Sequence, residues 1–127
     1  MGTVLVVDDE FGVADLIDAI LTDEGHQVLT AANGRQGLET LAKEQLDLVF
    51  LDYMMPIMDG SSMLRAVIDN PVFRKVPVVM MSSMPEASVA ERCPGYVAFM
   101  RKPFRIAEVI GFALRFIPKA GDSVSTG

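Results

Sequence analysis

The chain has 127 residues, carries a net charge of −6 and is half hydrophobic, which suits one domain with its own core and is too short for two. The negative charge argues against direct binding to nucleic acid, and no apolar run approaches the roughly 18–20 residues that span a bilayer. Because there is no secretion signal and the single cysteine, Cys93, cannot form an internal disulfide, we expect a cytoplasmic protein without membrane insertion.

Hydrophobic spacing predicts strands and helices in alternation. Short β-branched or continuous apolar runs indicate strands, whereas apolar residues three and four apart indicate helices. Strands are predicted over residues 3–7, 27–31, 46–51, 76–81 and 96–100. Helices are predicted from residue 11 to Gly25, after Asn33-Gly34, over 60–70, as one short helix over 85–92, and over 104–117. The last helix is expected to bury Ile106, Val109, Ile110, Ala113 and Leu114.

Five strand-then-helix units predict an α/β fold, a doubly wound five-stranded parallel sheet with helices on both faces, because right-handed crossovers distribute the helices in this way. All strands would then end at one edge of the sheet, where open sheets of this kind bind ligands. Polar residues end or directly follow four of the predicted strands: Asp8 and Asp9, Asp52, Ser82, and Lys102. The third strand is the most hydrophobic and yet ends on an acid, which makes Asp52 the main functional candidate.

These residue types form a coherent chemical set. Three carboxylates packed together repel one another unless a cation joins them, and Mg²⁺ suits carboxylates, carbonyl oxygens and waters. Lys102 adds an ammonium group that can pair with carboxylate or phosphate, and Ser82 adds a hydroxyl donor. Together they indicate a phosphoryl-transfer site with a carboxylate nucleophile at Asp52. For Asp8 and Asp9 taken alone, capping of the first helix is an equal alternative.

The segments VVDDE, FLDYMMPIMDG, VVMMSS and MRKPF, in this order and spacing, resemble the receiver domain of two-component response regulators. The resemblance covers residues 1–118 and implies a flavodoxin-like strand order 2-1-3-4-5 and a phosphorylation-controlled signalling switch, not an enzyme. By this resemblance Asp52 accepts a phosphoryl group from a histidine kinase or a histidine phosphotransfer protein. Mg²⁺ would be bound directly by Asp9, Asp52 and the backbone carbonyl of Met54, and through water by Asp8.

The same resemblance assigns roles beyond the acids. Ser82 matches the switch hydroxyl of the family, Phe99 its aromatic switch position, and Lys102 its lysine, and the bond from Lys102 to Pro103 matches one that is usually cis. The stretch between Ser82 and Lys102 is shorter than is typical, so we expect a short or poorly ordered fourth helix. The output partner is an unidentified protein, and residues 119–127 are expected to be a flexible tail or the stub of a linker.

Two other functions are weighed against this one. A constitutive interaction module would keep the fold without phosphorylation, but the complete set of acids, Ser82 and Lys102 argues against it. A small Mg²⁺-dependent phosphatase would need an Asp-x-Asp motif after the first strand, where this chain reads DDE, and a cap domain that does not fit the length. Six methionines near the predicted site, among them Met54 and Met84, are expected to serve as packing.

Overall fold

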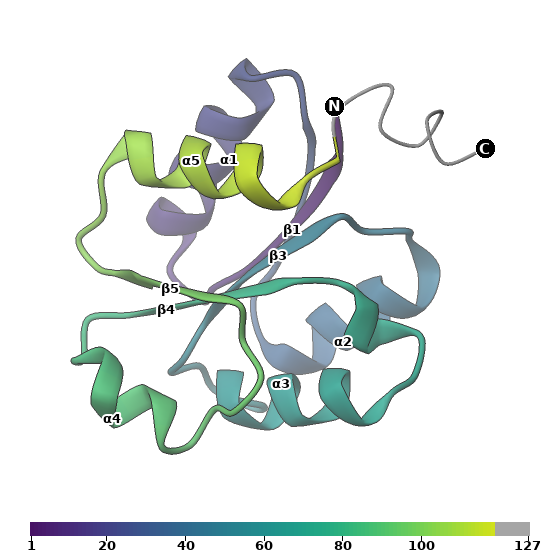
Figure 1. Ribbon diagram of the computed structural model, residues 1–127, viewed down its shortest axis with the longest axis vertical. Helices are drawn as coiled ribbons and strands as arrows, with labels where there is room; N and C mark the ends of the chain where they lie inside the picture. Colours follow the sequence, from purple (N-terminus) through teal and green to yellow (C-terminus); the bar gives the residue numbers. More distant parts are fainter. Residues whose placement is uncertain (119–127) are drawn as a thin grey trace.

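One parallel sheet lies at the centre of the computed structural model, which describes residues 1–118 (Figure 1). Its strands are β1 (Thr3–Val7), β2 (Gln27–Ala31), β3 (Leu48–Asp52), β4 (Val78–Ser82) and β5 (Ala98–Arg101), in the order β2-β1-β3-β4-β5. The helices are α1 (Phe11–Asp23), α2 (Gly34–Lys43), α3 (Gly60–Asp69), α4 (Glu86–Ala90), α5 (Ile106–Phe116) and the single 3-10 turn η1 (Phe73–Lys75). The predicted fold class and strand order are confirmed, whereas the predicted tail at 119–127 lies outside the described residues.

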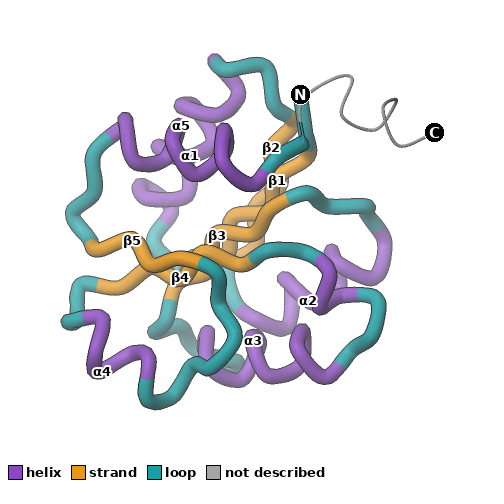
Figure 2. Tube along the Cα trace, in the orientation of Figure 1, coloured by secondary structure: helices purple, strands orange, loops and turns teal. Residues whose placement is uncertain are grey.

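Each face of the sheet has its own hydrophobic core. Successive side chains of a strand point to opposite faces, so β1 places Val4 and Val6 in one core and Leu5 and Val7 in the other. Helices α1 and α5 cover the first core, and α2, α3 and α4 cover the second (Figures 1 and 2). Every residue of β3 and β4 is buried, which explains why these strands read as continuous apolar runs.

Several element boundaries differ from the predicted ones. Strand β4 begins at Val78, not at residue 76, because Pro77 has no N–H to donate to the sheet, although its carbonyl accepts a bond from the Val49 N–H at 3.0 Å. The turn η1 was not predicted. It forms where the Asn70 side chain accepts the N–H groups of Val72 and Phe73, at 2.9 and 3.0 Å.

The prediction for the last helix was partly wrong. In α5 only Val109 and Ala113 are buried, Ile110 is half-buried, and Ile106 and Leu114 are 58% and 64% exposed. Leu114 follows Ala113 and is therefore rotated by about 100° away from the face that meets the sheet. The expected short fourth helix is confirmed, since α4 has five residues. Within residues 1–118 no helix combines the length and the apolar character that crossing a membrane requires.

Candidate functional site

Polar side chains from four strands meet at the carboxyl edge of the sheet. Asp52 and Ser82 are the last residues of β3 and β4, while Asp8 and Lys102 directly follow β1 and β5. The strands are parallel, so these ends lie at the same edge. The structure brings the four residues together, and Asp8, Asp52 and Ser82 are buried there among otherwise hydrophobic neighbours.

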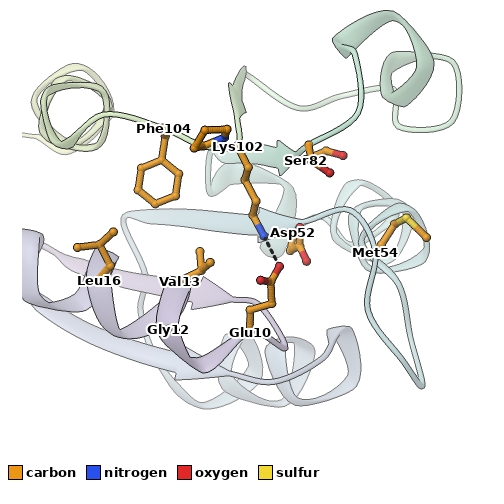
Figure 3. Close-up of a pocket in the computed structure, with 11 residues that line it drawn as sticks. Glu10, Gly12, Val13, Leu16, Asp52, Met54, Ser82, Lys102 and Phe104 are labelled. Carbon is orange, nitrogen blue, oxygen red and sulfur yellow. Dashed lines mark hydrogen bonds and ion pairs between the residues drawn. The ribbon is translucent and has the colours of Figure 1, made fainter.

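One ammonium group joins three carboxylates in this cluster. The Lys102 Nζ lies 2.8 Å from Asp8 Oδ2, 3.1 Å from Asp52 Oδ1 and 3.3 Å from Glu10 Oε1. Figure 3 shows the lysine reaching from the strand end toward Asp52 and Glu10. The side chains of Asp8 and Asp52 are 0% and 7% exposed, whereas that of Glu10 is 64% exposed. Asp8 and Asp52 are therefore enclosed by protein, whereas Glu10 faces solvent.

The surroundings of the site shift the pKa values of both Asp52 and Lys102. Burial, followed by the charge of Asp8, raises the pKa of Asp52 to about 7, although the charge and hydrogen bond of Lys102 act in the opposite direction. Burial alone would lower the pKa of Lys102. The hydrogen bond to Asp8 and the charges of Asp52 and Asp8 outweigh burial, so the pKa of Lys102 lies above its ordinary value. The cluster thus carries more negative charge than Lys102 can offset.

The structure places Asp9 and Glu10 differently from what the sequence indicated. Carboxylate oxygens of Asp8, Glu10 and Asp52 lie within 4.8 Å of one another, and exposed Asp9 is not in this group. Asp9 is nevertheless close enough for its charge to raise the pKa of Asp52. Glu10 was not a predicted site residue. Its backbone N–H donates to Asp8 Oδ1 at 2.9 Å, in the turn that leads into α1.

Helix capping does not account for the first pair of acids. The N-terminal cap position of α1 is Glu10, and no side chain forms a capping hydrogen bond there. Asp8 instead accepts the Glu10 N–H and the Lys102 ammonium. Its carboxylate therefore belongs to the charged cluster and not to the helix end.

A cavity of about 560 Å³ opens above the cluster. Asp52, Ser82 and Lys102 lie at its inner end, and Val13 and Leu16 of α1 face Phe104 across it (Figure 3). Met54 and Glu10 also line the cavity, together with Gly12, Ser83 and Pro103. The bond between Lys102 and Pro103 is cis. A phosphoryl-sized group could therefore reach Asp52 from solvent through this opening.

The two predicted switch residues lie in different surroundings. The buried Ser82 accepts the Met84 N–H through its Oγ at 3.0 Å, which leaves its own hydroxyl hydrogen to donate elsewhere. Phe99 is half-buried on β5, paired with Met80 of β4, and does not line the cavity. Its ring centroid is 6.3 Å from that of Tyr96, whose hydroxyl donates to Glu86 of α4 at 2.9 Å. Phe99 is thus linked to α4 through Tyr96.

The loop after Asp52 returns close against the strand end. The Asp59 side chain accepts the Ser62 N–H at 2.8 Å and so caps α3, and the Gly60 N–H donates to the Tyr53 carbonyl at 2.9 Å. A Cβ atom at Gly60 would collide with the backbone carbonyl oxygen of Asp52. This glycine therefore permits α3 to begin directly beside the candidate nucleophile.

The donor set fits a hard divalent cation. Carboxylate oxygens of three residues converge, and oxygen ligands of this kind are those that Mg²⁺ prefers. Burial and the charge of Asp8 raise the pKa of Asp52, and a cation bound at this place would offset both effects and favour the ionised carboxylate. The arrangement offers a carboxylate nucleophile, an ammonium group and a hydroxyl donor around one space, which is what phosphoryl transfer requires.

Comparison with known proteins supports one family. A family model described as the response regulator receiver domain matches residues 4–112. Sporulation initiation phosphotransferase F of Bacillus subtilis is 34% identical over 117 residues, which cover 91% of this chain and 93% of that protein. Response regulator PleD of Caulobacter vibrioides is 40% identical over 81 residues, 64% of this chain but only 18% of that protein.

Solved structures show the same similarity in three dimensions. The signal receiver domain of a histidine kinase from Syntrophus aciditrophicus has a TM-score of 0.84 and 27% identity, covering 91% of this chain and 89% of that one. Chemotaxis response regulator CheY4 of Vibrio cholerae has a TM-score of 0.82 and 27% identity, covering 91% and 98%.

Proposed function

The chain belongs to the family of response regulator receiver domains, and on this premise we propose that residues 1–118 form a phosphorylation-controlled signalling switch whose phosphoacceptor is Asp52. The observation that carries the proposal is the position of Asp52, buried at a strand end beside Lys102 and Ser82 and open to a solvent-accessible cavity. The phosphodonor would be a histidine kinase or a histidine phosphotransfer protein in the cytoplasm. One relative is itself named a phosphotransferase, which is consistent with such a relay.

In the proposed reaction an Asp52 carboxylate oxygen attacks the phosphorus of the donor. The bond from phosphorus to the donor's histidine nitrogen breaks, and its electron pair stays on that nitrogen. Because the other ring nitrogen of the donor carries a proton, the products are an aspartyl phosphate and a neutral imidazole. Lys102 and the hydroxyl of Ser82 are placed to hold the phosphoryl oxygens during and after transfer. The protein is consumed as a phosphoacceptor and does not turn over an external substrate.

The residues that would hold Mg²⁺ are Asp8, Asp9, Asp52 and the backbone carbonyl of Met54. When bound, Mg²⁺ supplies positive charge that offsets the carboxylates and the phosphoryl oxygens. The cluster of acids and the raised pKa of Asp52 support this assignment. Direct binding by Asp9 rests on the resemblance alone, because Asp9 is exposed and outside the three-carboxylate group.

Phosphorylation would act by shifting the population between two conformations. The new phosphoryl oxygens would attract Lys102 away from Asp8 and Glu10, and would attract the Ser82 hydroxyl. Movement of Ser82 would open space toward Phe99, whose ring could then turn inward. An output partner protein would recognise the changed surface.

The direct test is labelling with acetyl phosphate and Mg²⁺, followed by intact-mass and peptide mass spectrometry. Wild type should gain one hydroxylamine-labile phosphoryl group at Asp52, while Asp52→Asn gains none. Omission of Mg²⁺, or the substitution Asp9→Asn, should remove most of the labelling. Equal labelling of wild type and Asp52→Asn would disprove the assignment. Release of many phosphates per chain would favour the phosphatase alternative, and no labelling at all would favour the constitutive interaction module.

A further inference from the structure

Glu10 is the solvent-facing member of the three carboxylates around Lys102. Its Oε1 lies 3.3 Å from the Lys102 Nζ, on a side chain that is 64% exposed. Asp8 and Asp52 contact the same ammonium group from the protein side, at 2.8 and 3.1 Å. Figure 3 shows the Glu10 side chain reaching toward Lys102, with their ion pair drawn as a dashed line. The Glu10 carboxylate therefore lies between Lys102 and solvent.

A phosphodonor that enters the cavity comes close to this carboxylate. Glu10 lines the same cavity as Asp52, Ser82 and Lys102, so a phosphoryl group that enters the cavity approaches a fixed negative charge. The hydrogen bond from the Glu10 N–H to Asp8 Oδ1 at 2.9 Å fixes the backbone at this place. The Glu10 side chain therefore starts from a fixed backbone position beside the opening.

No nearby basic residue offsets Glu10 apart from Lys102. Within residues 1–118, Lys102 is its only ion-pair partner. All eleven lysines and arginines of the chain lie at position 35 or beyond, whereas seven acids precede them: Asp8, Asp9, Glu10, Asp15, Asp18, Asp23 and Glu24. Glu10 is the only charged residue of the β1–α1 segment that lines the cavity, beside the uncharged Gly12, Val13 and Leu16, so an approaching anion meets repulsion there that a partner's cation could relieve.

We propose that Glu10 makes the site select phosphodonors by charge, disfavouring small anionic donors relative to a protein donor that places a lysine or arginine opposite Glu10. The inference rests on the proposed phosphorylation of Asp52. Two effects act together. The Glu10 carboxylate repels a free anion that enters the cavity, and it competes with the phosphoryl oxygens for Lys102. A basic side chain from a protein donor would pair with Glu10 and remove both effects.

The experiment compares two small donors of different charge on the intact chain at saturating Mg²⁺. With acetyl phosphate, a dianion, the Asp52 oxygen forms a bond to phosphorus and acetate leaves with the electron pair of the P–O bond. With phosphoramidate, a monoanion, ammonia leaves with the electron pair of the P–N bond. The variants are Glu10→Gln, which removes the charge at nearly constant shape, Glu10→Asp, which keeps the charge, and Asp15→Asn, a charge-matched control outside the cavity lining.

Glu10→Gln should accelerate labelling by acetyl phosphate about fivefold and by phosphoramidate about twofold, and high salt should reduce both factors. Glu10→Asp and Asp15→Asn should stay within about twofold of wild type with either donor. Titration calorimetry should show that Glu10→Gln still binds Mg²⁺ within about tenfold of wild type.

Equal acceleration with both donors would overturn the proposal, because it would mean that Glu10 only competes for Lys102. Slower labelling together with a larger loss of Mg²⁺ affinity would also overturn it, by making Glu10 a metal ligand. Failure of the proposed function looks different. In that case neither donor labels Asp52 in wild type, whereas failure of this inference leaves wild type labelled but without discrimination by charge.

Discussion

At the scale of single residues, a methionine, Met54, lines the cavity in which the proposed aspartyl phosphate would form. Met54 lines the cavity and is 66% exposed, and Met84, two residues after Ser82, is 36% exposed. Met54 therefore does not serve as core packing, unlike Met80 and Met81, which are fully buried. A thioether is a very weak acceptor and donates nothing, so it can shield a phosphoryl group without orienting a water molecule.

From this we predict slow self-hydrolysis of the aspartyl phosphate. The double substitution Met54→Asn with Met84→Glu supplies polar groups within reach of the attacking water and should accelerate the loss of phosphate by about tenfold or more. The measurement is the decay of phosphorylated protein after the donor is removed. Decay of the double variant at the wild-type rate would show that the methionines do not control access of water.

The raised pKa of Asp52 predicts a pH-dependent stability in the absence of divalent cations. Its pKa is about 7 in the folded protein, against an ordinary value of 3.8. The folded state therefore binds the proton more tightly than the unfolded state, and the contribution of Asp52 to stability is lost as the pH rises from about 4 through about 7. Asp52→Asn should thus match wild type near pH 4 and exceed its free energy of unfolding by about 1–3 kcal/mol at pH 8.

Urea unfolding of both proteins in a chelating buffer at several pH values would measure this difference. Added Mg²⁺ should stabilise wild type at pH 8 and have little effect on Asp52→Asn. A difference between the two proteins that stays constant with pH would show that the Asp52 carboxyl is not perturbed by folding.

Most of the site could be predicted from strand ends. Asp8, Asp52, Ser82 and Lys102 follow directly from the parallel sheet, because each ends or directly follows a strand. The position of Glu10 could not be predicted in the same way. It lies in the turn between β1 and α1, where the side-chain direction depends on the hydrogen bond from its N–H to Asp8 and on the ion pair with Lys102.

At the scale of elements, the first residue of α3 packs directly against the last residue of β3. Gly60 opens the helix with no room for a Cβ beside the Asp52 carbonyl, and the Asp59 cap holds the first turn. Because this contact involves backbone on both sides, a larger residue cannot be accommodated by side-chain motion alone. The position of Asp52, the proposed phosphoacceptor, therefore depends on a glycine eight residues further along the chain.

We predict that Gly60→Ala lowers the free energy of unfolding by about 1–3 kcal/mol, through this overlap with backbone. The matched control is Gly111→Ala in α5, where an added Cβ meets nothing within 4 Å. The control should raise stability by about 0.5–1 kcal/mol, because alanine favours the helix over glycine. Thermal or urea unfolding measures both. Equal effects of the two substitutions would mean that the contact at Gly60 is relieved without cost.

Apart from the turn η1, the number, type and order of the elements were predictable, because the periodicities of buried strands and amphipathic helices differ clearly. Which positions of α5 are exposed could not be predicted from the sequence. Ile106 and Leu114 are apolar, but apolar residues also occur on surfaces. Leu114 is rotated away from the face that meets the sheet, whereas Ile106 shares the face of Ala113 but is the first residue of the helix and is exposed there. The beginning of β4 likewise depends on pairing with β3 across Pro77, a tertiary detail.

At the scale of the whole molecule, the site and α4 are connected through one edge of the sheet. Lys102 follows β5 directly, and Phe99 lies three residues before it on the same strand. The ring of Phe99 lies beside Tyr96, and the Tyr96 hydroxyl is bonded to Glu86 of α4. Because phenylalanine has no hydroxyl group, its inward rotation leaves no polar group to satisfy and costs little desolvation. Under the proposed function, a change at Asp52 would reach the outer surface through these contacts of Phe99, Tyr96 and Glu86.

Two-dimensional NMR before and after phosphorylation of Asp52 tests the proposed switch most directly. Upon addition of acetyl phosphate and Mg²⁺, we predict chemical-shift changes at Asp52, Ser82 and Lys102 that extend to Phe99, Tyr96 and the whole of α4. The Asp52→Asn variant should show only the changes that Mg²⁺ itself produces. Changes confined to the loops around Asp52, with Phe99 and α4 unchanged in fully phosphorylated protein, would contradict the proposal that phosphorylation shifts the domain between two conformations.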